Sequence, residues 1–388
     1  MLGYIVLVIF LLTWNPFFLA LPETFTFSFY VGPRDSLANV LLFLQVGFLY
    51  RLGQGRRRNA ILLGAAISAA IETGQFFIPG RTPSVVDITM NTLGSVLGAL
   101  LYDLLTARIA MTPRMLGRLG LEIPLMGVLY LLVPLLWLNR LIPGEALTRW
   151  LLTGLIGVCG AVVLSDVFQQ WWGPVNLGTL WRVALAAGIW FFVGIGPSLL
   201  ARPLAGVTGL GGIAILAAVL AAIPKSSDNR RFERATLRRL IPVFILYLLL
   251  QALWPFIQPI GAWHGTFGLT DPLAQEDIRV NIRLIEHLAA FTVLGYMLAE
   301  WHGRAELSWG RDFSQLLVLG LSGALILEFL VGFQTGPGAS LLRLIIATCG
   351  AVFGGILYHL QRDHVRFLLG RLTYSPLAAR SVGDGIRQ

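Results

Sequence analysis

Charged residues are scarce in this chain of 388 residues. Asp, Glu, Lys and Arg make up 13% of it, whereas a typical soluble protein carries about a quarter. Hydrophobic residues make up 56%, and the mean hydropathy is +0.74. Apolar runs of about 20 residues, the length that spans a bilayer, recur from end to end. The shortage of charge excludes an ordinary soluble domain and predicts a polytopic membrane protein.

Cysteine is also scarce, and the usual signatures of metal and cofactor sites are missing. The two cysteines, Cys159 and Cys349, both lie inside apolar runs, which predicts small buried residues rather than a disulfide or a metal site. No histidine-rich cluster, nucleophile elbow or phosphate-binding glycine loop occurs. We therefore expect no metal and no cofactor.

The positive charge is unevenly distributed along the chain. There are 29 Lys and Arg against 20 Asp and Glu, a net charge of +9. The basic segments lie near 51–58, 108–118, 225–239, 304–311 and 362–387. If every apolar run crosses a membrane, these segments all fall on one side, as the positive-inside rule requires. Anionic lipid headgroups are a sufficient partner for them, and we expect no nucleic-acid binding.

The predicted fold is all-α, with about twelve transmembrane helices and both termini in the cytoplasm. We interpret the first run as a span rather than a cleaved signal because no Arg or Lys precedes it. The predicted spans are 2–21, 36–50, 59–78, 85–105, 123–138, 150–168, 180–200, 207–223, 240–257, 282–300, 313–333 and 340–360.

The first four spans are echoed by the last four. "WNPFFLALP" at the end of the first span resembles "WPFIQP" at the end of the ninth, and Glu72 and Gly94 match Glu328 and Gly350. This predicts a parallel internal repeat of four-helix units. The expected parts are an N-terminal unit (1–118), a middle block ending in a basic cytoplasmic loop (119–239), and a second unit with a basic tail (240–388).

Polar residues fall in stripes on the third and fourth spans. Glu72 and Gln75 share one helical face, and Asp87 and Asn91 share another. A carboxylate in lipid costs about 3 kcal/mol or more, so both acids must face protein or water. We expect an outward-facing polar pocket, and a purely structural polar lock between helices stays open as the alternative. The candidate residues are Asp35, Asn39, Glu72, Gln75, Arg81, Asp87 and Asn91.

Four glycines occur at helix-packing spacing. Gly94 and Gly98 continue the stripe of Asp87 and Asn91, and Gly350 and Gly354 are their counterparts in the second copy. Each pair forms a small-xxx-small motif, which predicts close approach of a neighbouring helix.

This pattern resembles the VanZ-like family, named for a teicoplanin-resistance protein, over about residues 1–105. The matching positions are Arg34, Asp35, Asn39, Phe43, Gly47, Glu72, Gln75, Pro79, Gly80, Arg81, Ser84, Asp87, Asn91, Gly94 and Gly98. The resemblance implies a multi-pass protein of the bacterial inner membrane, with a link to the cell envelope and to glycopeptide resistance.

The second copy keeps the frame and loses most of the polar positions. Val331, Pro337, Arg343 and Ala347 stand where the first copy has Gln75, Arg81, Asp87 and Asn91. Its remaining polar side chains are Glu286, His287, Glu328 and Arg343. We expect these four to form a buried ion-pair network, with binding of a different ligand as the alternative.

The predicted function is recognition of an amphiphile through the outward pocket. The expected partners are membrane lipids, lipid-linked cell-envelope precursors or lipoglycopeptides. Two alternatives stay open. Glu72 and Asp87 could act as acid and base in a membrane enzyme for a lipid-linked substrate. Twelve spans in two copies also fit a transporter.

Overall fold

In the computed structural model the described residues are mostly helical. The structure describes residues 1–15, 19–22, 25–53, 55–106, 113–141, 146–172, 177–199, 232–254, 261–268, 278–302, 309–334 and 338–373. The helices of the first half are α1 (Leu2–Thr13), α2 (Pro33–Leu52), α3 (Arg57–Gln75), α4 (Val85–Thr106), α5 (Pro113–Leu141), α6 (Ala146–Trp172) and α7 (Leu177–Leu199). Those of the second half are α9 (Phe232–Leu253), α11 (Ile278–His302), α12 (Trp309–Val331) and α13 (Leu341–Thr373). Two short strands, β1 (Gly265–Thr266) and β2 (Ala339–Ser340), pair in parallel.

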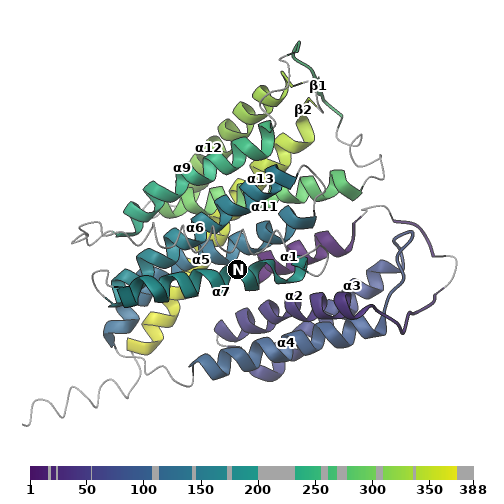
Figure 1. The fold of residues 1–388 in the computed structure, drawn as a ribbon, viewed down its shortest axis with the longest axis horizontal. Helices are drawn as coiled ribbons and strands as arrows, with labels where there is room; N and C mark the ends of the chain where they lie inside the picture. The colour runs from purple at the N-terminus through teal and green to yellow at the C-terminus, as the bar shows by residue number, and fades with distance from the viewer. Residues whose placement is uncertain are drawn as a thin grey trace, which may run out of the picture.

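The helices form two groups on either side of a middle layer. Figure 1 shows α2, α3 and α4 together on one side, α9, α11, α12 and α13 on the other, and α1, α5, α6 and α7 between them. We call α1–α4 the N-terminal unit, and α9 with α11–α13 the C-terminal unit. In each unit two helices run parallel in closest contact, α2 with α4 and α11 with α13.

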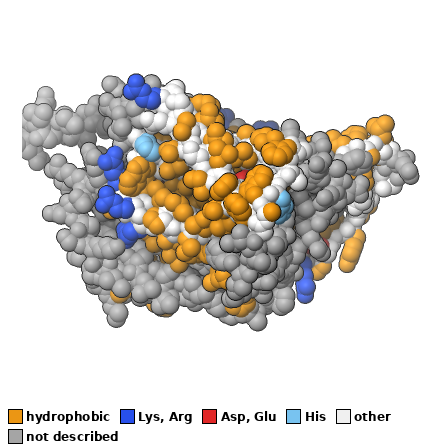
Figure 2. All heavy atoms as spheres, turned by 90° about the horizontal axis from the view of Figure 1, so that it is seen from above, with side chains coloured by type: hydrophobic (Ala, Val, Ile, Leu, Met, Phe, Trp, Pro, Cys, Tyr) orange, Lys and Arg blue, Asp and Glu red, His pale blue; other side chains and the backbone are white. Residues whose placement is uncertain are grey.

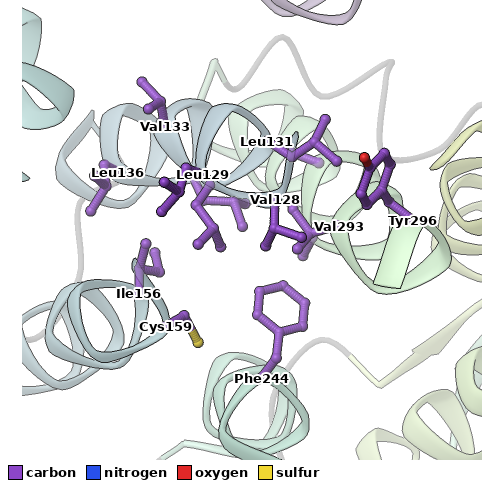
Figure 3. Close-up of a cluster of buried hydrophobic side chains, with 14 of the residues drawn as sticks. Val128, Leu129, Leu131, Val133, Leu136, Ile156, Cys159, Phe244, Val293 and Tyr296 are labelled. Atoms are coloured by element: carbon purple, nitrogen blue, oxygen red, sulfur yellow. The ribbon is translucent and has the colours of Figure 1, made fainter. Parts of the chain in front are cut away.

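The hydrophobic core lies along α5. Side chains of this helix that are 0% exposed include Val128, Leu131 and Leu136. Figure 3 shows Val128 toward Phe244 of α9 and Leu136 on the side of Ile156 of α6, and Cys159 belongs to the same cluster. The two units are therefore joined by a shared apolar interior that the middle layer provides.

Six described helices are long and apolar enough to cross a membrane. These stretches are Val85–Leu104, Thr148–Gln169, Glu233–Leu253, Asn281–His302, Phe313–Val331 and Leu341–Phe367, and shorter apolar helices are Leu2–Thr13, Pro124–Asn139 and Leu180–Gly196. Figure 2 shows one face on which hydrophobic side chains cover the middle, while Lys and Arg gather mainly at one end. The chain is a helical membrane protein. The count of twelve spans stays a prediction, and the eighth predicted span (207–223) lies outside the described residues.

The first span is shorter than its apolar sequence predicts. We expected a helix over 2–21, and α1 ends at Thr13. The reason is Pro16, because a residue before a proline is disfavoured in a helix, which places Asn15 outside α1. Twelve helical residues extend only about 18 Å.

Two further expectations concern the burial of the cysteines and the boundaries of the three parts. Cys159 is buried as predicted, but Cys349 is exposed on α13, because apolar runs in a membrane protein also form its outer surface. The expected boundaries at 118/119 and 239/240 fall inside α5 and α9. The division into three parts therefore stays a prediction.

Candidate functional site

Glu72 holds the turn between α3 and α4. This turn passes through Gly80, whose φ of 77° suits glycine. Glu72 Oε2 accepts a hydrogen bond from the backbone N–H of Ser84, at 2.7 Å. Ser84 is the N-cap of α4, and its Oγ accepts from the backbone N–H of Asp87, at 3.3 Å. In a capping box the third helical residue would bond the N-cap N–H, so here Glu72 releases Asp87 from that role.

Asp87 on α4 instead accepts a hydrogen bond from the parallel helix α2. Asn39 donates from Nδ2 to Asp87 Oδ1 at 2.7 Å, and both side chains are half-buried. Glu72 lies within electrostatic range of Asp87 and Arg81, and Asp87 within range of Asp35. The two acids thus meet where three helices converge.

Deeper polar residues tie the helices of the N-terminal unit together. Asn91 Nδ2 donates to Ser68 Oγ at 2.8 Å, between α4 and α3. Gln75 Nε2 donates to the Thr13 carbonyl at 3.4 Å, between α3 and α1. Asn91 is 4% exposed, and its Oδ1 has no hydrogen-bond partner. The buried amide therefore keeps one acceptor unused beneath the acids.

The remaining members of the predicted set lie at the surface. Asp35 and Arg81 are exposed, and Arg81 donates to the carbonyl of Asn15 at 3.1 Å. The seven residues differ in solvent exposure, from Glu72, which is 3% exposed, to Asp35, which lies at the surface. We call this set the polar cluster: Asp35, Asn39, Glu72, Gln75, Arg81, Asp87 and Asn91.

Glycines allow α4 to approach the backbone of α2 closely. A Cβ at Gly94 would collide with the carbonyl oxygen of Val40, and one at Gly98 with that of Leu44. This approach brings Asp87 within hydrogen-bond reach of Asn39, about two turns into α2. The same contact recurs in the C-terminal unit, where Gly350 and Gly354 face the carbonyls of Leu288 and Thr292 on α11.

The turn between α12 and α13 repeats the first turn with a change of charge. Glu328 Oε2 accepts from the N–H of Ser340 at 2.7 Å, again 12 residues along the chain. Arg343, at the position of Asp87, donates from Nε to Glu328 Oε1 at 3.0 Å and from a terminal nitrogen to Oε2 at 2.9 Å. It also donates to the Gly338 carbonyl. The acid of this turn is therefore neutralised within the protein.

The expected four-residue network of the second copy is divided into two places. Glu328 pairs with Arg343, whereas Glu286 on α11 pairs with Arg149 of α6 at 3.0 Å. His287 is half-buried on the same helix as Glu286. Glu286 and His287 are neighbours in the sequence, but consecutive side chains on a helix point in different directions. They therefore do not share a partner.

Sequence reasoning missed the polar group around Glu286. Arg149 also donates to Asn139 Oδ1 at 2.9 Å, and Tyr247 donates to Glu286 Oε1 at 3.4 Å. Glu286 is 1% exposed. Arg149 could have been noticed as a lone cation beside a long apolar run, since such a charge needs a partner in a membrane. A single sequence does not show that its partner is Glu286, which lies 137 residues away.

The fold and the polar cluster define a helical membrane protein with an acid-containing polar group at one end of a four-helix unit. The family model VanZ/LLP1 matches residues 3–106. The N-terminal part of the chain is therefore a VanZ-like domain. The match covers α1–α4 and does not extend to the C-terminal unit. Neither a curated protein nor a solved structure matches the chain.

Proposed function

We propose that this chain is a VanZ-like protein of the bacterial inner membrane that recognises an amphiphile of the cell envelope through its polar cluster. Both termini lie in the cytoplasm, so the cluster faces outward. The ligand is an envelope lipid, a lipid-linked precursor or a lipoglycopeptide, and binding it links the protein to glycopeptide resistance of the teicoplanin type.

One observation carries the proposal most directly. The half-buried pair of Asp87 and Asn39 lies beside buried Glu72, at the end of helices whose outer sides are apolar. Exposed hydrophobic side chains of α4 include Val85, Leu93, Leu97, Leu100 and Leu104. A polar head at the acids and apolar tails along these side chains would match an amphiphile.

A parallel repeat of two four-helix units is part of the same proposal. The glutamate-to-serine bonds at the two turns, both 2.7 Å, support it. A similar amide contact occurs in both units, although not at the matching position. Gln334, three residues beyond Val331, donates to the Leu253 carbonyl at 2.9 Å, as Gln75 does to that of Thr13. We infer that the C-terminal unit kept the frame of the first and replaced the ligand-facing acid with Arg343.

The test compares lipids that stay bound during purification. We expect native mass spectrometry to find a defined amphiphile on the wild type and to lose it in the Glu72→Gln/Asp87→Asn double variant. Asp363→Asn removes an exposed acid of α13 and serves as the control. The same lipids on all three folded proteins would overturn recognition by this cluster.

The link to resistance has a separate test. Expression of the wild type in a teicoplanin-sensitive host should raise the inhibitory concentration of teicoplanin, and Asp87→Asn should abolish the increase at equal protein level. An unchanged inhibitory concentration with wild-type protein in the membrane would remove the resistance part of the proposal and leave amphiphile binding standing.

A membrane enzyme is the second candidate, because two carboxylates, Glu72 and Asp87, lie within electrostatic range of each other. Such a pair can divide the roles of general acid and base. Turnover of a labelled lipid-linked precursor by the purified protein, lost in Glu72→Gln, would favour it. A bound but unaltered amphiphile would favour recognition alone.

A further inference from the structure

The two turns differ in where the positive charge comes from. In the C-terminal unit Glu328 receives three hydrogen bonds, one from the Ser340 N–H and two from the guanidinium of Arg343. In the N-terminal unit Glu72 receives the same N–H bond from Ser84. Among the described residues, Glu72 Oε1 has no hydrogen bond or ion pair. The first turn thus repeats the backbone arrangement of the second without a guanidinium bonded to its glutamate, although Arg81 lies within electrostatic range of Glu72.

The groups around this place are mainly acceptors. Glu72 and Asp87 are carboxylates, which accept hydrogen bonds when ionised. Asn39 and Asn91 each use one amide N–H, on Asp87 and Ser68, which leaves on each residue the amide oxygen and one further N–H. The Asn91 oxygen is buried without a partner. A ligand that satisfies these groups must donate hydrogen bonds and, beside two acids, must carry positive charge.

We propose that the polar cluster binds the ammonium group of an amphiphile, between Glu72 Oε1 and Asp87, in the place that the Arg343 guanidinium fills in the C-terminal unit. This rests on the proposed function and narrows its ligand to a class. Arg81 is exposed at the same turn, so a phosphate next to the ammonium group would meet a cation. An aminophospholipid head has both charges in that order.

The experiment uses full-length protein in nanodiscs that contain equal amounts of phosphatidylethanolamine and phosphatidylglycerol. After release into the gas phase, native mass spectrometry measures which lipid is retained. We expect the wild type to enrich phosphatidylethanolamine about tenfold or more, the factor that one charge-assisted hydrogen bond provides. Asp363→Asn should show the same enrichment.

Two variants test the place of binding. Glu72→Gln should lose the enrichment, but it also weakens the cap of α4. Asp87→Arg avoids this difficulty because it copies the C-terminal turn and supplies the cation from the protein itself. It should stay folded, with a melting temperature no lower than that of the wild type, and should lose the enrichment. Enrichment that persists in folded Asp87→Arg would overturn the proposed place.

The outcomes separate this inference from the proposed function. Equal retention of both lipids by the wild type, lost in Asp87→Arg, would overturn the ammonium assignment and keep amphiphile recognition. No retained lipid on the wild type would overturn both. Free ethanolamine, added to the detergent-solubilised protein, distinguishes the source of the amine. A stable complex with ethanolamine alone would identify a soluble amine as the ligand and overturn the lipid assignment.

Discussion

The N-terminal and C-terminal turns use the same frame for different charges. Each has a glutamate, buried in the first turn and half-buried in the second, that accepts a hydrogen bond from a serine N–H at 2.7 Å at the start of the next helix. Three residues after that serine stands Asp87 in the first and Arg343 in the second. The C-terminal turn is neutral within itself, whereas the N-terminal turn presents two acids. The charge at this position therefore differs between the two turns, and the proposed ligand site depends on the acid at position 87.

The largest effect should come from the glycines that both units share. Gly98→Ala and Gly354→Ala each place a Cβ against a backbone carbonyl, of Leu44 and Thr292. Overpacking costs about 1–3 kcal/mol and occasionally more. Because a backbone carbonyl cannot move aside as a flexible side chain can, we expect each of these two substitutions to cost more than that range. We expect both variants to lower the melting temperature in detergent strongly and equally.

Gly323→Ala is the control for this pair, because its Cβ would have no atom within 4 Å. It should be neutral or slightly stabilising, since alanine favours a helix over glycine by about 1 kcal/mol. A large loss in only one of the two packing variants would break the structural equivalence of the units.

The next largest effect should differ between the two turns, because their charges are balanced differently. Arg343→Met leaves Glu328 without its cation. Breaking a fully buried pair costs about 3–5 kcal/mol, and because the two side chains here are 16% and 13% exposed, we expect a smaller cost. Asp87→Asn removes a charge and keeps a group that Asn39 can bond, so the cost should be near that of one hydrogen bond, about 1 kcal/mol. Thermal unfolding of both variants measures the difference.

The double variant Glu328→Gln/Arg343→Met should recover most of the loss, because it removes both charges together. If Asp87→Asn proves as damaging as Arg343→Met, the polar cluster is a structural lock rather than a binding site.

A smaller and equal effect is expected from the two amides that hold the first helix of each unit. Gln75 bonds the Thr13 carbonyl at 3.4 Å and Gln334 bonds the Leu253 carbonyl at 2.9 Å. Gln75→Met and Gln334→Met each remove one such bond, worth about 1 kcal/mol. Melting temperatures that fall by similar small amounts would sharpen the comparison, and a loss confined to one variant would weaken it.

The smallest effect lies at the other end of the parallel helix pairs. Arg51 and Asp103 join α2 to α4 with side chains 23% and 32% exposed, and such pairs contribute about 0–1 kcal/mol. The pair α11 and α13 is joined instead by Tyr296 and Gln361 at 2.8 Å. Arg51→Met should cost little, and high salt should remove the cost by screening. The cost of Tyr296→Phe should be independent of salt.

The sequence was informative where spacing along one helix determines the structure. Apolar composition predicted a helical membrane protein, and the motif of spaced polar residues predicted the VanZ-like domain that the family match confirms. Residues such as Glu72 and Asp87 stood out because a charge in an apolar context needs a reason.

Contacts between residues far apart in the chain could not be predicted from the sequence. Nothing in the sequence connects Arg149 with Glu286, or Asn15 with Asn281, because these pairs depend on how the helices pack. The direction in which an apolar helix faces was equally hidden, which is why Cys349 was expected to be buried and is exposed. The early end of α1 could have been read from Pro16.

Helix α1 belongs to the matched domain and yet is embedded in the rest of the protein. Its Tyr4 hydroxyl donates to the Leu131 carbonyl of α5 at 3.3 Å, and Asn15 at its end accepts from Asn281 of α11 at 3.1 Å. Ile5 and Val8 are at most 1% exposed. The hydrogen bond between Asn15 and Asn281 can therefore form only after most of the chain has been synthesised. The VanZ-like domain is therefore not structurally independent of the rest of the chain. If it were excised, the face of α1 that packs against α5 and α11 would be exposed to lipid.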